Sequence, residues 1–186
     1  NAPGSPGALN GKGTIHFTSG NNNLYATGLK TSKYLGICGS QPRTVFVVMR
    51  REIGHSMLVN MGSTETNGGF LGVRDGENYL SLPSFPGSSA GIMGKLSNSW
   101  HILEIVYDGT SCTGHVFGGS RKTVNLPVNT VDREVEIGLG TIDRPATDAE
   151  VSDGDFAELL IYNRALTEAE QRQISYPSTL KPVGWL

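Results

Sequence analysis

The sequence is poor in several residue types on which particular functions depend. Only 17% of its 186 residues are charged, and the 15 Lys and Arg are dispersed among 17 Asp and Glu. A chain without a basic stripe has little support as a nucleic-acid binder. No apolar run approaches the ~20 residues of a transmembrane helix, and no glycine-rich phosphate loop precedes a helix. The four histidines are far apart and form no cluster with cysteine, which argues against a zinc site.

Cysteine is also scarce, with only Cys38 and Cys112 in the chain. Each lies in a polar segment between predicted strands. A disulfide between them would close a loop of roughly 75 residues and stabilise the fold by up to roughly 4 kcal/mol. Two unrelated thiols are the alternative. The distance between the two Cα atoms decides between these hypotheses, so the sequence leaves both open.

Glycine, by contrast, is abundant, at 25 of 186 residues, against a usual share of ~7%. The glycines are scattered between short apolar runs, as they are in the turns of all-β folds. Asp75-Gly76 predicts a hairpin. The expected strands are 14–18, 24–27, 44–50, 57–61, 70–74, 79–82, 92–93, 100–107, 113–117, 122–126, 135–139 and 156–162.

The last of these runs is followed by a helix signal. Thr167 lies three residues before Glu170, which is the spacing of a capping box. Pro177 ends the predicted helix within about three turns. Many short strands and one C-terminal helix predict a single all-β domain over residues 1–186, an antiparallel β-sandwich. Residues 1–7 and 177–186 are expected to be terminal arms.

Three segments of the chain resemble the laminin-G-like, concanavalin-A-like jelly-roll family. The most specific one runs from Gly154 to Glu170 and reads GDFAELLIYNRALTEAE, close to the last strand and closing helix of that family. The segments 9–17 and 100–109 resemble its opening strand and its central strand and turn. The resemblance implies a concanavalin-A-like jelly roll and an extracellular module for recognition or adhesion, secreted or on the surface of a cell or virion.

Two carboxylates lie within otherwise apolar strands. Glu104 and Glu158 each share a strand face with apolar neighbours, so each needs a partner or water. One hypothesis is a pair in a sugar-binding groove that acts as the acid and nucleophile of a glycosidase. The other is that each bonds a nearby hydroxyl or Arg. We favour the second, because Glu158 belongs to a family motif that also occurs in members without catalysis.

Other candidate catalytic groups fit known patterns less well. Asp132, Glu134 and Glu136 alternate as D-x-E-x-E, whereas glycoside hydrolases of similar fold use E-x-D-x-x-E. His101 and His115 are expected to meet across a hairpin that turns at residues 108–111, as polar residues on a wet sheet face. The expectation is therefore that the protein is not an enzyme.

Calcium is the one metal that the sequence suggests, because it prefers clustered hard oxygens. The acidic turn common in the family has no carboxylate in the matching segment 17–25. A second acidic segment carries the candidate ligands, and a solvated loop with Asp155 capping a turn is the alternative. These candidates are Asp148, Glu150, Asp153 and Asp155.

The function that the sequence favours is glycan binding without catalysis, with a glycan or glycoprotein surface as the partner. Amide, carboxylate and aromatic side chains near predicted turns suit sugar hydroxyls and pyranose faces. The candidates are Asn21, Asn23, Tyr25, Asp75, Asn78 and Tyr79. Two alternatives remain open. One is a structural subunit of a virion surface or adhesive filament, which would bind copies of itself or other subunits, and the other is a polysaccharide hydrolase or lyase.

Overall fold

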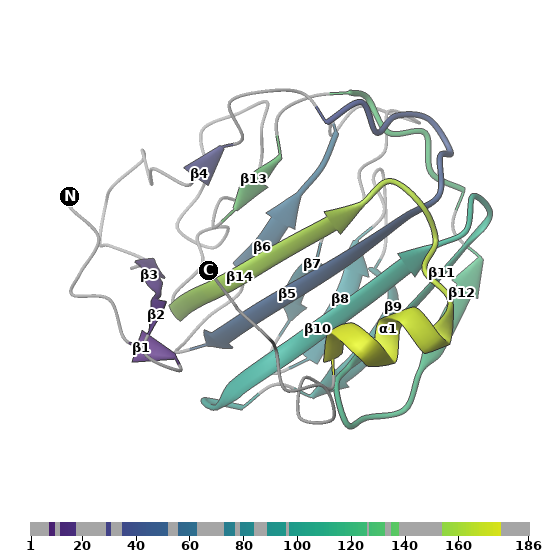
Figure 1. Ribbon diagram of the computed structural model, residues 1–186. Coiled ribbons are helices and arrows are strands. Elements are labelled where there is room, and N and C mark those ends of the chain that lie inside the picture. The colour runs from purple at the N-terminus through teal and green to yellow at the C-terminus, as the bar shows by residue number, and fades with distance from the viewer. Residues whose placement is uncertain are drawn as a thin grey trace.

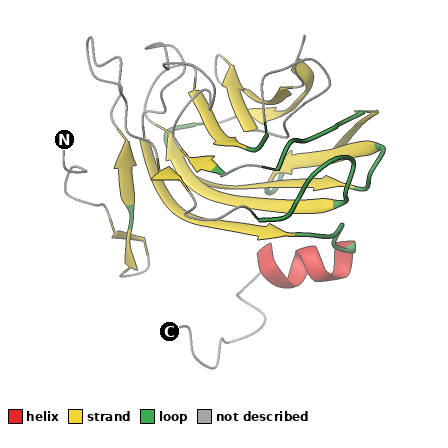
Figure 2. Cartoon of the chain, turned by 90° about the horizontal axis from the view of Figure 1, so that it is seen from above, coloured by secondary structure: helices red, strands yellow, loops and turns green. Residues whose placement is uncertain are grey.

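The chain forms two antiparallel sheets stacked face to face, with one helix on the outside of one of them (Figure 1, Figure 2). The computed structural model describes residues 8–9, 12–17, 29–30, 35–51, 56–62, 73–76, 79–83, 89–95, 97–125, 127–132, 135–137 and 154–175. The sheet beside the helix, called the helix-side sheet, has six strands in the order β12-β11-β10-β5-β14-β3. The opposite sheet, called the far sheet, has the order β4-β13-β6-β7-β8-β9, and β1 and β2 form a separate hairpin.

The elements have the following bounds. The strands are β1 Ala8–Leu9, β2 Lys12–Gly13, β3 Ile15–Phe17, β4 Leu29–Lys30, β5 Arg43–Arg51, β6 Ser56–Asn60, β7 Val73–Gly76, β8 Tyr79–Pro83, β9 Ser89–Lys95, β10 Trp100–Tyr107, β11 Ser111–Val116, β12 Lys122–Asn125, β13 Glu136–Ile137 and β14 Gly154–Tyr162. The helix α1 spans Glu168–Ser175. No described helix is long and apolar enough to cross a membrane.

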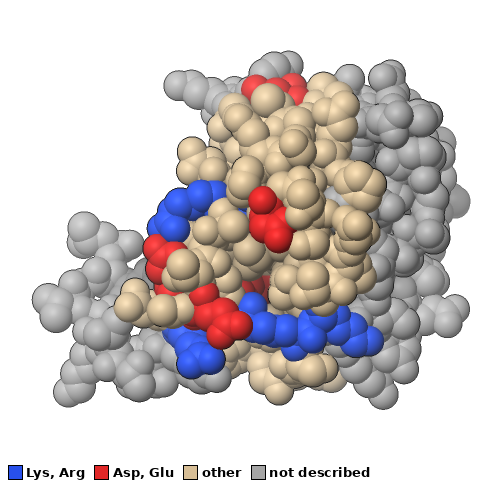
Figure 3. Space-filling model, turned by 90° about the vertical axis from the view of Figure 1, so that its right-hand side faces the viewer, with Lys and Arg blue, Asp and Glu red and all other residues tan. Residues whose placement is uncertain are grey.

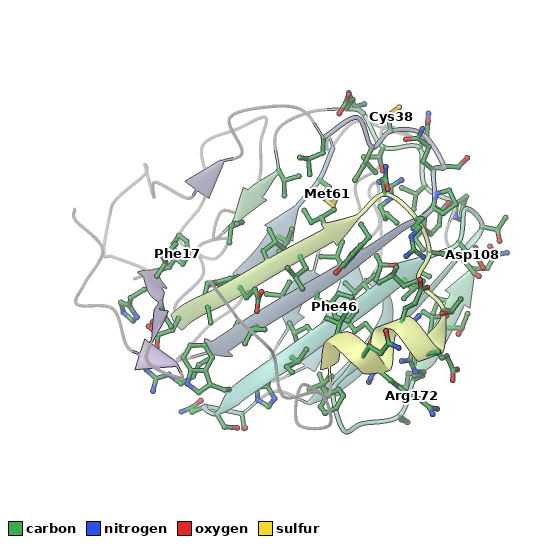
Figure 4. All side chains as sticks on the ribbon, in the orientation of Figure 1. Phe17, Cys38, Phe46, Met61, Asp108 and Arg172 are labelled. Atoms are coloured by element: carbon green, nitrogen blue, oxygen red, sulfur yellow. The ribbon has the colours of Figure 1, made fainter. Side chains whose placement is uncertain are left out.

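Strand β5 shows how the sequence divides between the two faces of the helix-side sheet. Val45, Val47 and Met49 belong to the core between the sheets. The residues between them face outward, as the period of two in a strand requires. On that outer face, the ring of Phe46 contacts the ring of Tyr162 edge-on at 6.3 Å. α1 and the segment leading into it cover part of this outer face (Figure 4), and Phe46 is buried there.

The strand predictions are confirmed for most of the described chain. Strands β10 and β14 lie in the interior of the helix-side sheet, as their apolar character on both faces indicates. The predicted hairpin forms between β7 and β8, in which Gly76 pairs with Tyr79. Asp75-Gly76 ends β7. The predicted strand at 24–27 and both predicted arms lie outside the described residues.

The predicted capping box forms at the start of α1. The backbone N–H of Thr167 donates to Glu170 Oε2 at 2.8 Å, and the N–H of Glu170 donates to Thr167 Oγ1 at 3.4 Å. Arg164 adds a fork of two bonds to the same carboxylate, at 3.0 and 2.7 Å. These bonds lower the pKa of Glu170 to about 2, with Arg164 as the main cause. The cap therefore stays ionised over the whole physiological range.

Replacing Thr167 by alanine is expected to destabilise the protein by about 1 kcal/mol, because the Glu170 N–H loses its acceptor. Urea denaturation of both proteins measures the difference. The matched control is Thr113→Ala, since Thr113 bonds Thr123 on the outer side of β11 and has no part in the cap. An unchanged midpoint for Thr167→Ala would show that Thr167 is not the N-cap.

The two cysteines are free thiols in the structure, so the disulfide hypothesis is not supported. Cys112 is fully buried in the core, and burial raises the pKa of its thiol to about 12. Cys38 is half-buried in the loop before β5. The alternative of two unrelated thiols is the one that the structure matches.

Candidate functional site

A pocket opens on the outer face of the helix-side sheet, where α1 meets β10, β11 and the turn between β11 and β12. Its volume is about 260 Å³. We call it the α1 pocket. Figure 3 looks at this side of the molecule, where acidic and basic side chains gather next to each other along the lower edge of the described surface. The residues lining it are Glu104, His115, Phe117, Gly118, Gly119, Arg121, Gln171 and Arg172.

Strand register brings Glu104 and His115 together on the floor of the pocket. The two residues are direct partners in the β10–β11 ladder. Both are on the outer face, since Leu103 and Val116 beside them belong to the core. The distance from His115 Nε2 to Glu104 Oε2 is 4.0 Å.

Glu104 is a buried acid with one short polar contact among the described residues. Its exposed fraction is 1%. Arg121 Nη2 donates to Glu104 Oε1 at 3.3 Å, which confirms the expectation that Glu104 bonds an Arg. Burial raises the pKa of Glu104, and the charge of Arg121 and its hydrogen bond act in the opposite direction.

His115 is 5% exposed, and its Nδ1 atom has no hydrogen-bond partner among the described residues. Burial lowers the pKa of His115, and the nearby Arg121 lowers it further. His115 is therefore neutral around pH 7. A buried polar atom without a partner costs about 1–3 kcal/mol, so such an atom on a pocket floor points to a missing partner.

Helix α1 supplies the opposite wall. Gln171 is 4% exposed, and its Nε2 donates to the carbonyl of Leu166 at 2.5 Å. Its Oε1 is buried without a partner in the described part of the chain. The next residue, Arg172, lies at the exposed side of the helix (Figure 4) and contacts Glu168 at 3.4 Å. The pocket thus contains a second unsatisfied polar atom, and it comes from a different element than the first.

The turn after β11 forms the rim. The N–H of Phe117 donates to the Ile102 carbonyl at 2.8 Å, and the N–H of Gly119 donates to the Val116 carbonyl at 2.9 Å. Gly118 has a φ of 86°, a left-handed conformation that favours glycine. A Cβ atom at Gly118 would meet nothing within 4 Å. Since Gly118 and Gly119 carry no side chains, the pocket is open to solvent at this rim.

A separate group of charged side chains lies on the outer face of the same sheet, away from the α1 pocket. Asp155 is 2% exposed. It bonds His16 Nδ1 at 2.9 Å and Arg50 Nε at 2.9 Å, and Arg50 stacks over the Trp100 ring at 5.7 Å. Asp155, a predicted calcium ligand, thus binds His16 and Arg50 in the structure.

The other three predicted calcium ligands, Asp148, Glu150 and Asp153, lie outside the described residues. Among the residues that the structure does describe, no group of three potential metal ligands occurs. The calcium site at these residues therefore stays a prediction.

The predicted glycan-binding residues stay a prediction, because the structure describes the strand positions of only two of them, Asp75 and Tyr79. Asp75 ends β7 and Tyr79 begins β8, but the positions of their side chains are not described. The other four candidates, Asn21, Asn23, Tyr25 and Asn78, lie outside the described residues.

The candidate catalytic groups that the structure describes do not lie together. Glu158 is on the outer face of β14, with β5 between it and Glu104, and it does not line the pocket. Contrary to the expectation, His101 does not meet His115, because the register pairs His115 with Glu104. His101 bonds Ser97 instead. Asp132 accepts a bond from the Gly36 N–H at 3.2 Å. Glu134 lies outside the described residues, and Glu136 is in β13.

Sequence reasoning singled out Glu104 and His115 but missed three residues of the pocket: Arg121, Gln171 and Arg172. Arg121 follows a Gly-Gly-Ser turn and has the appearance of an ordinary exposed base. Gln171 is one of several polar residues in a polar helix. A signal existed only for Glu104, because a lone charge within an apolar strand requires a partner from elsewhere.

Comparison with known proteins gives matches in structure only. No family model and no curated protein matches the sequence. A heptameric SAP-like pentraxin from Limulus polyphemus has a TM-score of 0.72 at 14% identity, over 91% of this chain and 84% of that one. Domain 4 of an extracellular arabinanase from Geobacillus stearothermophilus, in complex with arabinotriose, has a TM-score of 0.63 at 16% identity, over 87% of this chain and 75% of that one.

A third match is the mouse laminin α1 chain, domains LG4-5, with a TM-score of 0.61 at 14% identity. It covers 89% of this chain and 45% of that one. Enzymes are also among the matches, including a Trypanosoma rangeli sialidase and an alginate lyase. At such identities the similarity is one of fold. The fold is the concanavalin-A-like jelly roll, as the sequence motifs predicted.

Proposed function

We propose that this jelly-roll domain recognises glycans without cleaving them, outside the cell or on a surface. The observation that carries the proposal is the α1 pocket, in which His115 Nδ1 and Gln171 Oε1 lack partners among the described residues, beside Glu104 and Arg121. Sugar hydroxyls both donate and accept hydrogen bonds, so they match a pocket that offers both kinds of group. The arabinotriose in the structure of the arabinanase domain is consistent with this assignment.

The acids that line the pocket support the proposal that the protein does not cleave its ligand. A glycosidase of the usual kind places two carboxyl groups on either side of the bond that breaks. Glu104 is the single carboxylate among the described residues that line the α1 pocket. His115, whose pKa is lowered by burial, would be a weak base in a pocket whose Arg121 already contacts Glu104. The pocket can therefore hold a sugar, but its described lining has no acid–base pair for hydrolysis.

A glycan array probed with the purified domain tests binding, and a panel of polysaccharides tests turnover. We expect oligosaccharide binding with a dissociation constant in the millimolar to micromolar range, about −4 to −8 kcal/mol. We expect no release of reducing ends or unsaturated sugars. The absence of any glycan ligand would favour a structural subunit, whereas turnover that is lost in Glu104→Gln would favour the enzyme.

A further inference from the structure

We propose that the α1 pocket binds one uncharged sugar unit through two neighbouring hydroxyl groups. The inference rests on the proposed function, since it names the class of glycan for the same site.

The charges around the pocket are balanced, which favours an uncharged ligand. Arg121 contacts Glu104 at 3.3 Å, and Arg172 contacts Glu168 at 3.4 Å. An acidic ligand would approach the buried carboxylate of Glu104, and a cationic ligand would approach the guanidinium of Arg121. Like charges brought together in a partly dry site are disfavoured. A neutral ligand avoids both contacts.

The hydrogen-bonding groups complement a pair of hydroxyls. Glu104 and Gln171 Oε1 offer acceptors, whereas Arg121 offers donors. A hydroxyl can donate to an acceptor and accept from a donor at the same time. His115 Nδ1 can take either role, because the tautomer of a neutral imidazole adapts to its partner. Two adjacent hydroxyls would therefore satisfy the groups on the floor and on the helix wall together.

The size of the pocket limits the ligand to about one ring. Its volume of about 260 Å³ lies below the ~300–1,000 Å³ of pockets for drug-sized ligands. Phe117 supplies a phenyl ring to the lining, and an aromatic face packs against the C–H groups of a sugar ring. The open rim at Gly118 leaves room for the rest of a glycan to extend into solvent.

Titration of the 15N-labelled protein with simple sugars tests the ligand class. The probes are the methyl glycosides of glucose, galactose and mannose, each compared with its uronic acid and its 2-amino sugar. At least one neutral glycoside should shift the amide signals of β10, β11 and α1. Its charged analogues should bind about tenfold more weakly, because their charge meets the like charge of Glu104 or Arg121. Equal or tighter binding of a charged analogue would overturn the inference, and so would binding of N-acetylglycine methylamide in preference to every sugar.

Matched pairs of variants test the location. His115→Leu and Gln171→Leu remove the unpaired polar atoms and should each weaken binding of the neutral glycoside about tenfold. Their controls, His101→Leu and Gln173→Leu, change the same residue types outside the pocket and should leave binding unchanged. The amide spectrum of each variant verifies its folding.

Two outcomes separate this inference from the proposed function. If sugars bind but neither pocket variant weakens binding, the ligand site is elsewhere, and glycan recognition still holds. If no sugar binds in the titration or on the array, both proposals fail.

Discussion

Replacing Arg43 by alanine is expected to destabilise the protein by at least ~3 kcal/mol. The side chain of Arg43 is fully buried at one end of the sandwich. It donates to Thr130 Oγ1 at 2.9 Å, to the Gly39 carbonyl at 3.0 Å and to the Gln41 carbonyl at 3.1 Å. Hydrogen bonds to a charged donor contribute roughly 1.5–3 kcal/mol each, and the acceptors would be left buried.

The position of Arg43 explains why its loss is expected to lower stability so much. It is opposite Tyr107 in the β5–β10 ladder, and its guanidinium lies over the Tyr107 ring at 5.4 Å. Its three bonds join the loop before β5 to the segment around Thr130, which also pairs with Gly39 through two backbone bonds. Arg43 therefore ties these two segments together at this end of the core.

Thermal and urea unfolding measure the effect. A loss of ~3 kcal/mol corresponds to a fall of roughly 6–12 °C in the melting temperature for a chain of this size. Arg43→Lys keeps the charge but loses the planar fork, so it should lie between alanine and wild type. Arg172→Ala is the exposed control and should leave stability unchanged. A wild-type melting temperature for Arg43→Ala would contradict the assigned role.

Arg43 also shows where sequence reasoning ends. The sequence predicted a strand over residues 44–50, which leaves out Arg43. In the structure Arg43 is the first residue of β5 and points into the core, with neutral oxygens as its hydrogen-bond partners. One of those oxygens, on Thr130, comes from a segment far along the chain. Nothing local in the sequence predicts that Arg43 and Thr130 are in contact.

The fold was predictable because its signals are local. Apolar runs such as those of β10 and β14, turn residues and the capping box at Thr167 each act within a few neighbours. The α1 pocket was only partly predictable. Glu104 stood out as a charge in an apolar strand, but its partners depend on strand register and on where α1 docks. Gln171 and Arg121 reach the pocket through that tertiary arrangement alone.

Replacing Glu104 by glutamine is expected to make the protein more stable and its proposed sugar site weaker. The pKa of Glu104 is raised by burial, so the folded state binds its proton more tightly than the unfolded state. The stability of the wild type therefore falls as pH rises from the unfolded pKa, about 4.3, through the folded one. Glutamine removes this cost and still accepts a bond from Arg121. The variant is therefore expected to be the more stable protein at pH 7.

The gain should depend on pH in a defined direction. Below about pH 4 the carboxyl is protonated in both states, so the variant and the wild type should differ little. His115, whose pKa is lowered by burial, makes both proteins less stable as pH falls below about 6.5. This contribution largely cancels in the difference between the two proteins. Urea denaturation of both from about pH 3.5 to 8 measures the difference, with Glu158→Gln as a control on the same sheet face.

Sugar binding should change in the opposite direction to stability. Glutamine offers one acceptor oxygen where glutamate offers two, so the affinity for a neutral glycoside should fall about tenfold in Glu104→Gln and stay unchanged in Glu158→Gln. A residue that lowers stability where a neutral residue would fit is typical of a functional site. If Glu104→Gln instead lowers stability at pH 7, the ion pair with Arg121 stabilises the folded protein. That result would contradict the role in ligand binding inferred for Glu104.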